Sequence, residues 1–398
     1  MEPLAIHGGP PTRNSILSYG RQSIDDNDIQ NVVEVLKGEY LTTGPYVQLF
    51  ENQIAEYVGA KYAVAVSSGT GALHMACFAA GIGKDDQVIV SPLTFAASAN
   101  CILYCGGIPV FADIDPQTFN IGLHDIERKI TPKTKALIPV DFAGQSVDMD
   151  AINKIARKHN LIVIEDAAHA LGSSYKGNKV GNNADLTAFS FHPVKPITTG
   201  EGGVVTTNNE SYYQRMLQFR AHGITRETEL SLQTESSWYY EQQFLGYNYR
   251  LTDLQSALGS SQLKKIDVFI SRRRYLAQIY SAAFLAMDEL IVPCEADYAA
   301  SGWHIYVIRL KLPLLNVSRN TVFAALRAEN IGVNLHYIPV YLHPYYKRLG
   351  YEAGLCPQAE QVYQEIITLP LFPSMSDEDA QDVIKAVKKV INYYRRQK

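Results

Sequence analysis

A lysine held between two prolines is the residue of this sequence best suited to covalent chemistry. Lys195 stands between Pro193 and Pro196, directly after the apolar stretch 186–191, and glycines follow between positions 200 and 203. The prolines disfavour helix and fix the local backbone, and the glycines let it approach a bulky group. A lysine in an apolar, constricted site loses hydration, which lowers its pKa and frees the amine to attack a carbonyl. A lysine in a surface loop is the alternative on this segment alone.

An acidic pair ends another apolar run. Glu165 and Asp166 follow the run 161–164, and His169 comes three residues later. Ligands of open α/β sheets bind beyond the carboxyl ends of the strands, so Asp166 is expected to face a site. Its carboxylate could keep a pyridine nitrogen protonated, which makes the ring an electron sink. Taken alone, an aspartate here more often caps the next helix, and a lone histidine is more often partly buried with its hydrogen bonds satisfied.

Three further segments could contact a ligand. Gly69 and Thr70 lie in a turn of small residues between a predicted strand and a helix, where free N–H groups and the helix dipole attract an anion. This turn is neither a Walker motif nor G-x-G-x-x-G, and many strand–helix turns look similar. Phe95 offers a flat face for stacking, or is a core aromatic. Asn248 and Arg250 precede another helix and could bind phosphate or carboxylate, or cap that helix.

These segments together contain what pyridoxal 5′-phosphate (PLP) requires. The turn at Gly69 is a phosphate cradle, Asp166 is an acid for the ring nitrogen, and Lys195 is an amine for covalent attachment. The acid precedes the lysine by about thirty residues. The combination predicts a PLP site that none of the segments predicts by itself.

The elements that must position these residues alternate between strands and helices. Short apolar runs predict strands at 63–66, 87–90, 109–112, 136–140, 161–164, 186–191 and 204–206, and helical periods predict helices at 72–80, 96–104 and 149–159. This alternation indicates βαβ units and a mostly parallel sheet covered by helices on both faces.

The flanking segments are mainly helical. Helices are predicted at 24–36, with Ser23 and Asp26 as a capping box, and at 47–57. After about residue 250 we expect helices at 251–263, 268–284, 321–329 and 377–394, the last capped by Ser376, and a strand at 304–310. We predict a large domain over residues 1–265, whose N-terminal segment can pack on a small α+β domain over residues 266–398.

Composition excludes several classes of protein. Of the 398 residues, 46% are apolar, and 36 basic and 40 acidic residues give a net charge of −4, so a globular chain without nucleic-acid binding is expected. Arg272–Arg274, a rare basic cluster, is expected to be a solvated surface. The five cysteines are scattered without close metal ligands, so we expect reduced thiols and no metal. Neither a secretory signal nor a membrane span is visible, which predicts a cytoplasmic protein.

At this level of detail the sequence resembles the DegT/DnrJ/StrS family of sugar aminotransferases, which share fold type I of PLP enzymes. The resemblance covers nearly the whole chain, and its combination of motifs is highly specific. It includes 41–45 (LTTGP), 68–73 (SGTGAL), 113–115 (DID), 165–169 (EDAAH), Ser190-Phe191, Lys195, 200–203 (GEGG), His222-Gly223 and 247–250 (YNYR).

The resemblance implies a role for each matched residue. Lys195 would bind the PLP aldehyde and later shuttle a proton, Asp166 would pair with the pyridine nitrogen, and His169 would lie near the ring hydroxyl. The other cofactor contacts implied are Gly69, Thr70 and Ser190 at the phosphate, Phe95 stacked on the ring, and Asn248 at the phosphate of the neighbouring subunit. A homodimer with a shared active site is therefore expected.

The resemblance also implies a reaction. Dehydratases of the family have His at the position of Lys195, so the lysine favours transamination, and segment 192–203 is most similar to the pseudaminic-acid branch. The expected substrates are L-glutamate and a 4-keto-6-deoxy UDP-N-acetyl-hexosamine, aminated at C4. The alternatives are another keto-sugar nucleotide, dTDP-linked or keto at C3, and a non-catalytic regulator. Arg226, Arg250, His336 and Tyr337 are candidates to bind the diphosphate or the donor carboxylate. The Arg272–Arg274 cluster is a further candidate, although solvated surface charge is the favoured interpretation for it.

Overall fold

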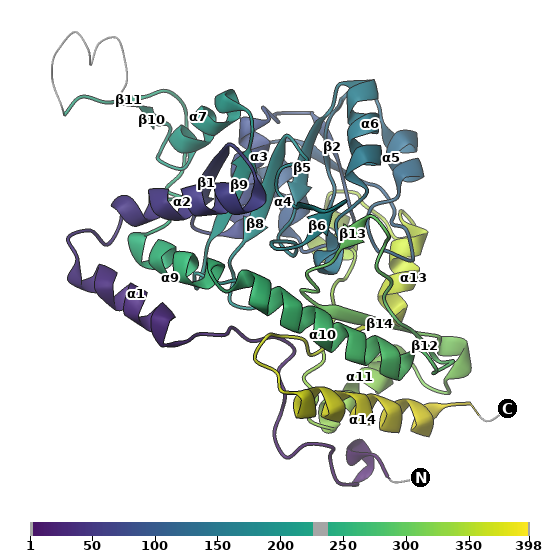
Figure 1. The fold of residues 1–398 in the computed structure, drawn as a ribbon. Helices are drawn as coiled ribbons and strands as arrows, with labels where there is room; N and C mark the ends of the chain where they lie inside the picture. Colours follow the sequence, from purple (N-terminus) through teal and green to yellow (C-terminus); the bar gives the residue numbers. More distant parts are fainter. Residues whose placement is uncertain (1–2, 226–237, 397–398) are drawn as a thin grey trace.

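A seven-stranded sheet lies at the centre of the computed structural model, which describes residues 3–225 and 238–396 (Figure 1). The strand order is β1-β9-β8-β5-β4-β2-β3. Only β9 runs antiparallel to its neighbours, and the other adjacent pairs are parallel. The strands are β1 (Tyr62–Val66), β2 (Gln87–Val90), β3 (Ile108–Phe111), β4 (Thr134–Ile138), β5 (Ile162–Asp166), β8 (Leu186–Ser190) and β9 (Gly203–Thr207).

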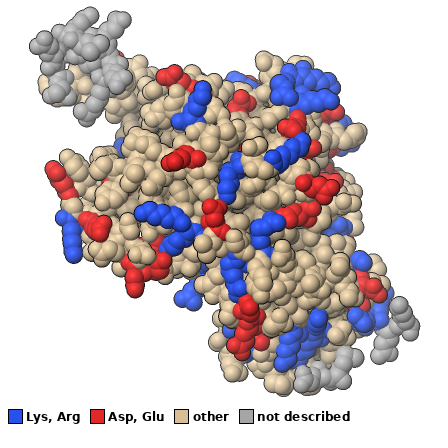
Figure 2. Space-filling view, in the orientation of Figure 1, with Lys and Arg blue, Asp and Glu red and all other residues tan. Residues whose placement is uncertain are grey.

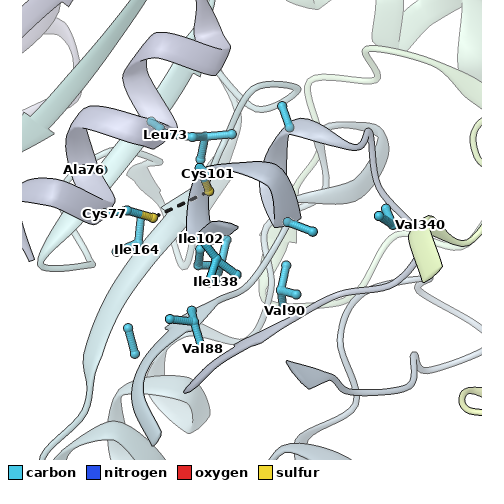
Figure 3. Packing of buried hydrophobic residues seen from close by; sticks show 14 of the residues in the cluster. Leu73, Ala76, Cys77, Val88, Val90, Cys101, Ile102, Ile138, Ile164 and Val340 are labelled. Carbon is cyan, nitrogen blue, oxygen red and sulfur yellow. Dashed lines mark hydrogen bonds between the residues drawn. The ribbon is translucent and has the colours of Figure 1, made fainter. Parts of the chain in front are cut away.

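Helices cover both faces of this sheet, which explains why its strands are apolar throughout. Alternate residues of a strand point to opposite faces. Val88 and Val90 of β2 pack with Ile164 of β5 against α3 and α4 (Figure 3), whereas Ile89 packs on the opposite face against α6. The helices around the sheet are α2 (Pro45–Val58), α3 (Gly69–Ala79), α4 (Ala97–Tyr104), α5 (Leu123–Lys129), α6 (Met149–His159), α7 (Glu210–Phe219) and α9 (Asp253–Leu263).

The C-terminal part builds a second, smaller core around an antiparallel sheet in the order β12-β14-β15. Leu4 and Leu17 belong to this core, so the N-terminal segment packs on the C-terminal part. The elements are β12 (Leu290–Ile291), β14 (Tyr306–Leu310), β15 (Ile366–Leu369), α10 (Ile266–Phe284), α11 (Arg319–Ala328), α12 (Pro344–Arg348), α13 (Pro357–Glu365) and α14 (Asp377–Tyr394). The predicted α/β class with a smaller α+β part is confirmed, while the boundary at residue 265 stays a prediction.

One further helix, α1 (Asp26–Lys37), precedes α2 in the chain, and the remaining elements are short. The short ones are β6 (Ser174–Tyr175), β7 (Asn178–Lys179), β10 (Ile224–Thr225), β11 (Glu241–Gln242), β13 (Ala299–Ala300) and the 3-10 turns η1 (Ala5–His7), η2 (Phe142–Gly144), η3 (Leu312–Leu314) and η4 (Val340–Leu342). The hairpin β10–β11 projects from the body of the molecule (Figure 1).

The N-terminal segment 17–23 runs between the two cores. Its Leu17 carbonyl accepts a hydrogen bond from the Gly332 amide at 2.7 Å, and its Tyr19 carbonyl accepts one from the Leu371 amide at 3.0 Å. At the other end the Gln262 side chain of α9 donates to the Ser23 carbonyl at 2.8 Å. The segment therefore ties the smaller core to the helices of the larger one.

Further features of the described residues concern their surface charge, possible membrane spans, possible metal sites and cysteines. Figure 2 shows basic and acidic side chains interspersed on one face. Within residues 3–225 and 238–396, no helix has the length and apolarity to span a membrane, and no cluster of three or more His, Cys, Asp or Glu could hold a metal ion. All five cysteines are free; Cys77 and Cys101 meet in the core with sulfurs 3.5 Å apart (Figure 3).

The cap of α1 differs from the prediction. The N-cap is Asp25, whose carboxylate accepts the Asp28 amide at 3.0 Å, and Asp28 accepts the Asp25 amide in return at 3.0 Å. The predicted Ser23–Asp26 box is wrong because Ser23 lies in the segment fixed by Gln262, and because Lys265 pairs with both Asp25 and Asp28. The cap of α14 at Ser376 is confirmed.

We expect the two candidate caps of α1 to differ in a substitution test. Asp25→Ala should lower the local stability of α1 by about 1 kcal/mol and speed amide hydrogen exchange over residues 26–37 about fivefold. Ser23→Ala is the matched control, because its side chain makes no hydrogen bond within the described residues. Equal exchange rates in the two variants would contradict the assignment of Asp25.

Candidate active site

A cavity of about 520 Å³ lies at the carboxyl ends of β5 and β8. It collects seven of the eight predicted cofactor contacts, and Asn248 is the exception. Both cores contribute to its wall, as does the N-terminal segment. The lining residues are Tyr19, Ser68, Gly69, Thr70, Leu73, Thr94, Phe95, Ala97, Ser98, Val140, Asp166, Ala168, His169, Ser190, His192, Val194, Lys195, Glu201, His304, Asn334, Leu335, His336 and Tyr337.

Lys195 reaches this cavity from the loop between β8 and β9. The loop is fixed by hydrogen bonds from the Lys195 amide to the His192 carbonyl at 2.9 Å and from the Thr198 hydroxyl to the Phe191 carbonyl at 3.0 Å. Loss of hydration lowers the pKa of Lys195 to about 8, the carboxylate of Asp166 opposes this shift, and the cation of Arg273 adds to it. About a tenth of the amine is therefore uncharged at pH 7, whereas an ordinary lysine is almost entirely charged.

Asp166 ends β5 as a buried carboxylate with two local donors. The Ser98 hydroxyl, on α4, donates to it at 2.6 Å, and the Ala168 amide donates at 3.2 Å. Burial raises the pKa of Asp166, whereas these two hydrogen bonds and the nearby Lys195 favour its ionised form. A cationic ring nitrogen placed against this carboxylate would stabilise the ionised form further.

Two more buried carboxyls lie behind Asp166. Asp141 and Glu165 are both fully buried, and one oxygen of each carboxyl has no hydrogen-bond partner within the described residues. Burial raises the pKa of Glu165 to about 7. The Thr187 hydroxyl donates to Glu165 at 2.9 Å, and the Val147 amide donates to Asp141 at 3.0 Å. The pKa of Asp141 is also raised by burial and by Glu165. The sequence analysis did not predict a role for Asp141, because no motif around this residue indicates that it lies next to Glu165 and Asp166 in the fold.

His169 is a neutral histidine with an unused ring nitrogen. Its Nε2 lies 3.1 Å from the Tyr337 hydroxyl, whereas its buried Nδ1 has no partner within the described residues. Burial holds the pKa of His169 well below its usual value, and the His304 ring lies 4.3 Å away. His169 lines the cavity, and a buried histidine nitrogen without a partner can hydrogen-bond to a polar ligand atom, such as a ring oxygen.

The turn before α3 fits an anion. Ser68 caps this helix by accepting the Gly71 amide at 3.0 Å, so the amides of Gly69 and Thr70 are left without intrahelical partners. A Cβ at Gly69 would lie 2.7 Å from the Cβ of Ser190, so only glycine allows the turn to pack against β8. The Ser190 side chain lines the cavity beside these amides.

Phe95 and Asn248 lie outside the protein core. Phe95 is 63% exposed, so the alternative that it is a core aromatic is wrong, and its ring lies 6.3 Å from that of Tyr337. Asn248 is exposed, bridges to Ala221 and does not line the cavity. Arg250 bridges to Val66, away from the cavity.

Of the other candidates, His336 and Tyr337 line the cavity, and Arg226 lies outside the described residues. Sequence reasoning missed several lining residues that come from distant segments. Ser98 was hidden within a predicted helix, His304 within a predicted strand, and Tyr19 and Asn334 within segments that had no recognisable motif. Since each of these reaches the cavity through tertiary packing, no local signal marked them.

Comparison with known proteins decides the family. The model of the DegT/DnrJ/EryC1/StrS aminotransferase family matches residues 22–388. The chain belongs to this family. It is 45% identical to the spore coat polysaccharide biosynthesis protein SpsC of Bacillus subtilis, over 95% of this chain and 98% of that protein. It is 40% identical to the UDP-4-amino-4,6-dideoxy-N-acetyl-beta-L-altrosamine transaminase of Campylobacter jejuni, over 92% and 96% respectively.

Solved structures of the family have the same fold. Helicobacter pylori PseC, an aminotransferase involved in the biosynthesis of pseudoaminic acid, matches with a TM-score of 0.89 and 33% identity, over 96% of this chain and all of that one. The PLP form of Spr1654 from Streptococcus pneumoniae matches with a TM-score of 0.88 and 30% identity, over 95% and 99%. This member of the family is therefore a PLP-dependent aminotransferase.

The residues of the cavity fit PLP. A glycine turn with two free amides suits the phosphate, the unpaired His169 nitrogen suits the ring hydroxyl, and the Asp166 carboxylate suits a protonated pyridine nitrogen. Lys195 supplies an amine of lowered pKa in the same cavity. The donor set thus matches every polar group of the cofactor.

We expect the reaction of the PLP-free enzyme with added PLP to follow the titration of Lys195. The uncharged amine is the nucleophile, so the rate of covalent binding should rise with pH and level off above about 8. Stopped-flow measurement of the visible absorbance from about pH 6 to about pH 11.5 gives this profile. An inflection at the ordinary lysine pKa of 10.5 would contradict the burial argument.

Proposed function

We propose that this aminotransferase moves an amino group from L-glutamate to C4 of a 4-keto-6-deoxy UDP-N-acetyl-hexosamine, in nucleotide-sugar biosynthesis of the pseudaminic-acid type. The observation that carries the chemistry is that one cavity contains both an amine of lowered pKa, on Lys195, and a buried carboxylate, on Asp166. The substrate assignment is supported by the names of the Campylobacter and Helicobacter relatives. The SpsC similarity makes another keto-sugar nucleotide the second candidate.

Each cavity residue has a defined task in this proposal. When bound, PLP supplies the electron-withdrawing ring that makes the donor Cα–H bond acidic. Asp166 would keep the ring nitrogen protonated, and the amine of Lys195 would accept and return the proton of the donor Cα. His169 would hydrogen-bond to the ring oxygen, and Gly69, Thr70 and Ser190 would hold the phosphate.

Exposure of Phe95 supports its assignment as the stacking residue. Its 63% exposed ring leaves an apolar face free for the cofactor, which would shield that face from water. Asn334, His336 and Tyr337 come from the C-terminal part of the chain and line the same cavity, and we propose that the sugar lies against them. Burial raises the pKa of Tyr337 and lowers that of His336 to about 3, so both are neutral hydrogen-bonding groups at physiological pH.

We further propose a homodimer in which Asn248 completes the phosphate site of the partner subunit. Asn248 is exposed and absent from the cavity of its own chain. Exposed apolar side chains stand near it in sequence: Leu245 is 76% and Tyr247 38% exposed, and Tyr240 is 55% exposed. Large apolar groups exposed together favour burial against another chain.

We expect Lys195→Ala to abolish transamination. The variant lacks both the covalent anchor and the proton carrier, so activity should fall at least about 10⁴-fold and the visible absorbance of the bound cofactor should disappear. Lys158→Ala, which removes a surface partner of Glu127, is the control and should retain wild-type activity. Turnover by Lys195→Ala would refute the assignment of Lys195.

The substrate is tested with a panel of keto-sugar nucleotides. UDP-linked 4-keto, dTDP-linked 4-keto and 3-keto sugars are each incubated with the enzyme and glutamate, and formation of 2-oxoglutarate is measured. We expect the highest kcat/KM for the UDP-linked 4-keto-6-deoxy N-acetyl sugar. Preference for another sugar would transfer the assignment to the second candidate and leave the aminotransferase chemistry intact.

The shared site is tested by mixing inactive subunits. In a dimer of one Lys195→Ala and one Asn248→Ala chain, one site has both defects and the other has neither if Asn248 acts across the interface. Random co-assembly should then restore about a quarter of wild-type activity. If Asn248 acts within its own chain, every site has one defect and the mixture should stay as inactive as the separate variants.

A further inference from the structure

The middle residue of the Arg272–Arg274 cluster is buried rather than solvated. Arg272 pairs with Asp377 at 2.7 Å and Arg274 pairs with Glu295 at 2.6 Å, both in partly exposed positions on α10. Arg273, between them, is only 1% exposed and points into the protein. The sequence expectation of a surface cluster is therefore wrong for Arg273. Successive helical residues are about 100° apart, so Arg272 and Arg274 lie on either side of Arg273, which faces the protein.

Arg273 has no counter-ion. Its Nη1 donates to the carbonyls of Leu371 at 2.8 Å, His304 at 2.9 Å and Trp303 at 3.4 Å, and its Nε has no partner. Across residues 3–225 and 238–396, no carboxylate lies within ion-pair distance of it. Carbonyl dipoles satisfy hydrogen bonds but supply no net negative charge, so the positive charge remains uncompensated in a low-dielectric interior. Burial lowers the pKa of Arg273 to about 10, which still leaves it charged at neutral pH.

This charge lies beside Lys195. The two side chains line the same small crevice, together with Pro193 and Pro196, whereas Lys195 and Asp166 line the main cavity. The cation of Arg273 lowers the pKa of Lys195, and the carboxylate of Asp166 raises it. Lys195 is thus subject to one positive and one negative buried group, in a setting where Coulomb interactions are stronger than in water.

We propose that Arg273 is a positioning residue whose buried charge disfavours protonation of the nitrogen of Lys195, both as the free amine and when it is attached to PLP. This inference rests on the proposed function of Lys195. An uncharged nitrogen is the nucleophile and the proton acceptor that transamination needs, and a fixed cation favours that state without contacting the substrate. The same guanidinium donates a hydrogen bond to the backbone carbonyl of His304. The ring of His304 packs against His169, which would contact the cofactor.

Other groups also act on Lys195, and the test must separate them from Arg273. Burial is the largest cause of the lowered pKa, and the bound phosphate of PLP would oppose Arg273. The titratable side chains that share the main cavity with Lys195 are Tyr19, Asp166, His169, His192, Glu201, His304, His336 and Tyr337, and Arg21 lies in the smaller crevice. Because these groups stay in place when Arg273 is replaced, only substitutions that remove the charge report its contribution.

The experiment is a pH titration of the visible absorbance of the holoenzyme. Arg273→Gln keeps amide donors for the carbonyls but removes the charge, and we expect the midpoint to move upward by about one pH unit. Arg273→Lys keeps the charge but not the planar fork, so its midpoint should stay near that of the wild type although its thermal stability falls. Arg272→Gln, one residue away and ion-paired outside, is the matched control and should leave both properties near wild type.

Three outcomes would overturn the inference. They are an unchanged midpoint in Arg273→Gln, an upward shift of equal size in Arg273→Lys, and an equal shift in Arg272→Gln. If Arg273→Gln fails to fold, the titration midpoint of Arg273→Lys alone tests the inference. This variant keeps the positive charge, so a shifted midpoint would show that the charge is not the cause. A wild-type enzyme without any visible band would instead refute the proposed function, so the two failures are distinguishable.

Discussion

The active site depends on placing the amine of Lys195 and the carboxyl of Asp166 in one poorly hydrated cavity, where the amine must lose its proton while the carboxyl stays ionised. Burial disfavours charge on Lys195 and on Asp166 alike, yet each stabilises the charged form of the other. The Ser98 hydroxyl and the Ala168 amide favour the ionised form of Asp166 independently of the lysine. Lys195 is therefore free to lose its charge, which is the asymmetry that an amine nucleophile and an acid partner for a pyridine nitrogen require.

The sheet topology explains how two residues about thirty positions apart meet. Strands β5 and β8 are parallel neighbours, so Asp166 and Ser190 end at the same edge of the sheet. Strand β9 then runs antiparallel to β8, so the connection is a loop at that edge rather than a helix across a face. Lys195 lies in this loop, and β1, next to β9, delivers the Gly69 turn to the same edge. The single reversed strand thus gathers the lysine and the phosphate cradle.

Sequence patterns predicted the features that depend on neighbouring residues in the chain. They failed for features whose structure depends on contacts between distant segments. Apolar periodicity located all seven strands of the central sheet, because burial on both faces leaves continuous apolar runs. Asp166 and Lys195 were found because each ends or follows such a run. The α1 cap was misassigned because Lys265 and Gln262, more than 200 residues away, select Asp25 and Asp28. Arg273 was misread because its inward orientation depends on the carbonyls of the segment before β14 and of Leu371.

Three carboxyls are buried at the cofactor site, and their mutual repulsion limits how many of them can be ionised. Asp141, Glu165 and Asp166 are buried close together, and three negative charges there would repel one another strongly. Burial raises the pKa of Asp141 and the pKa of Glu165, and a neighbouring acid raises each of them further. Because these two carboxyls resist ionisation, they place less negative charge beside Asp166 than two ordinary carboxylates would. The donors from Ser98 and Ala168 and the nearby Lys195 favour the ionised form of Asp166, so ionisation is favoured at the acid that lines the cavity.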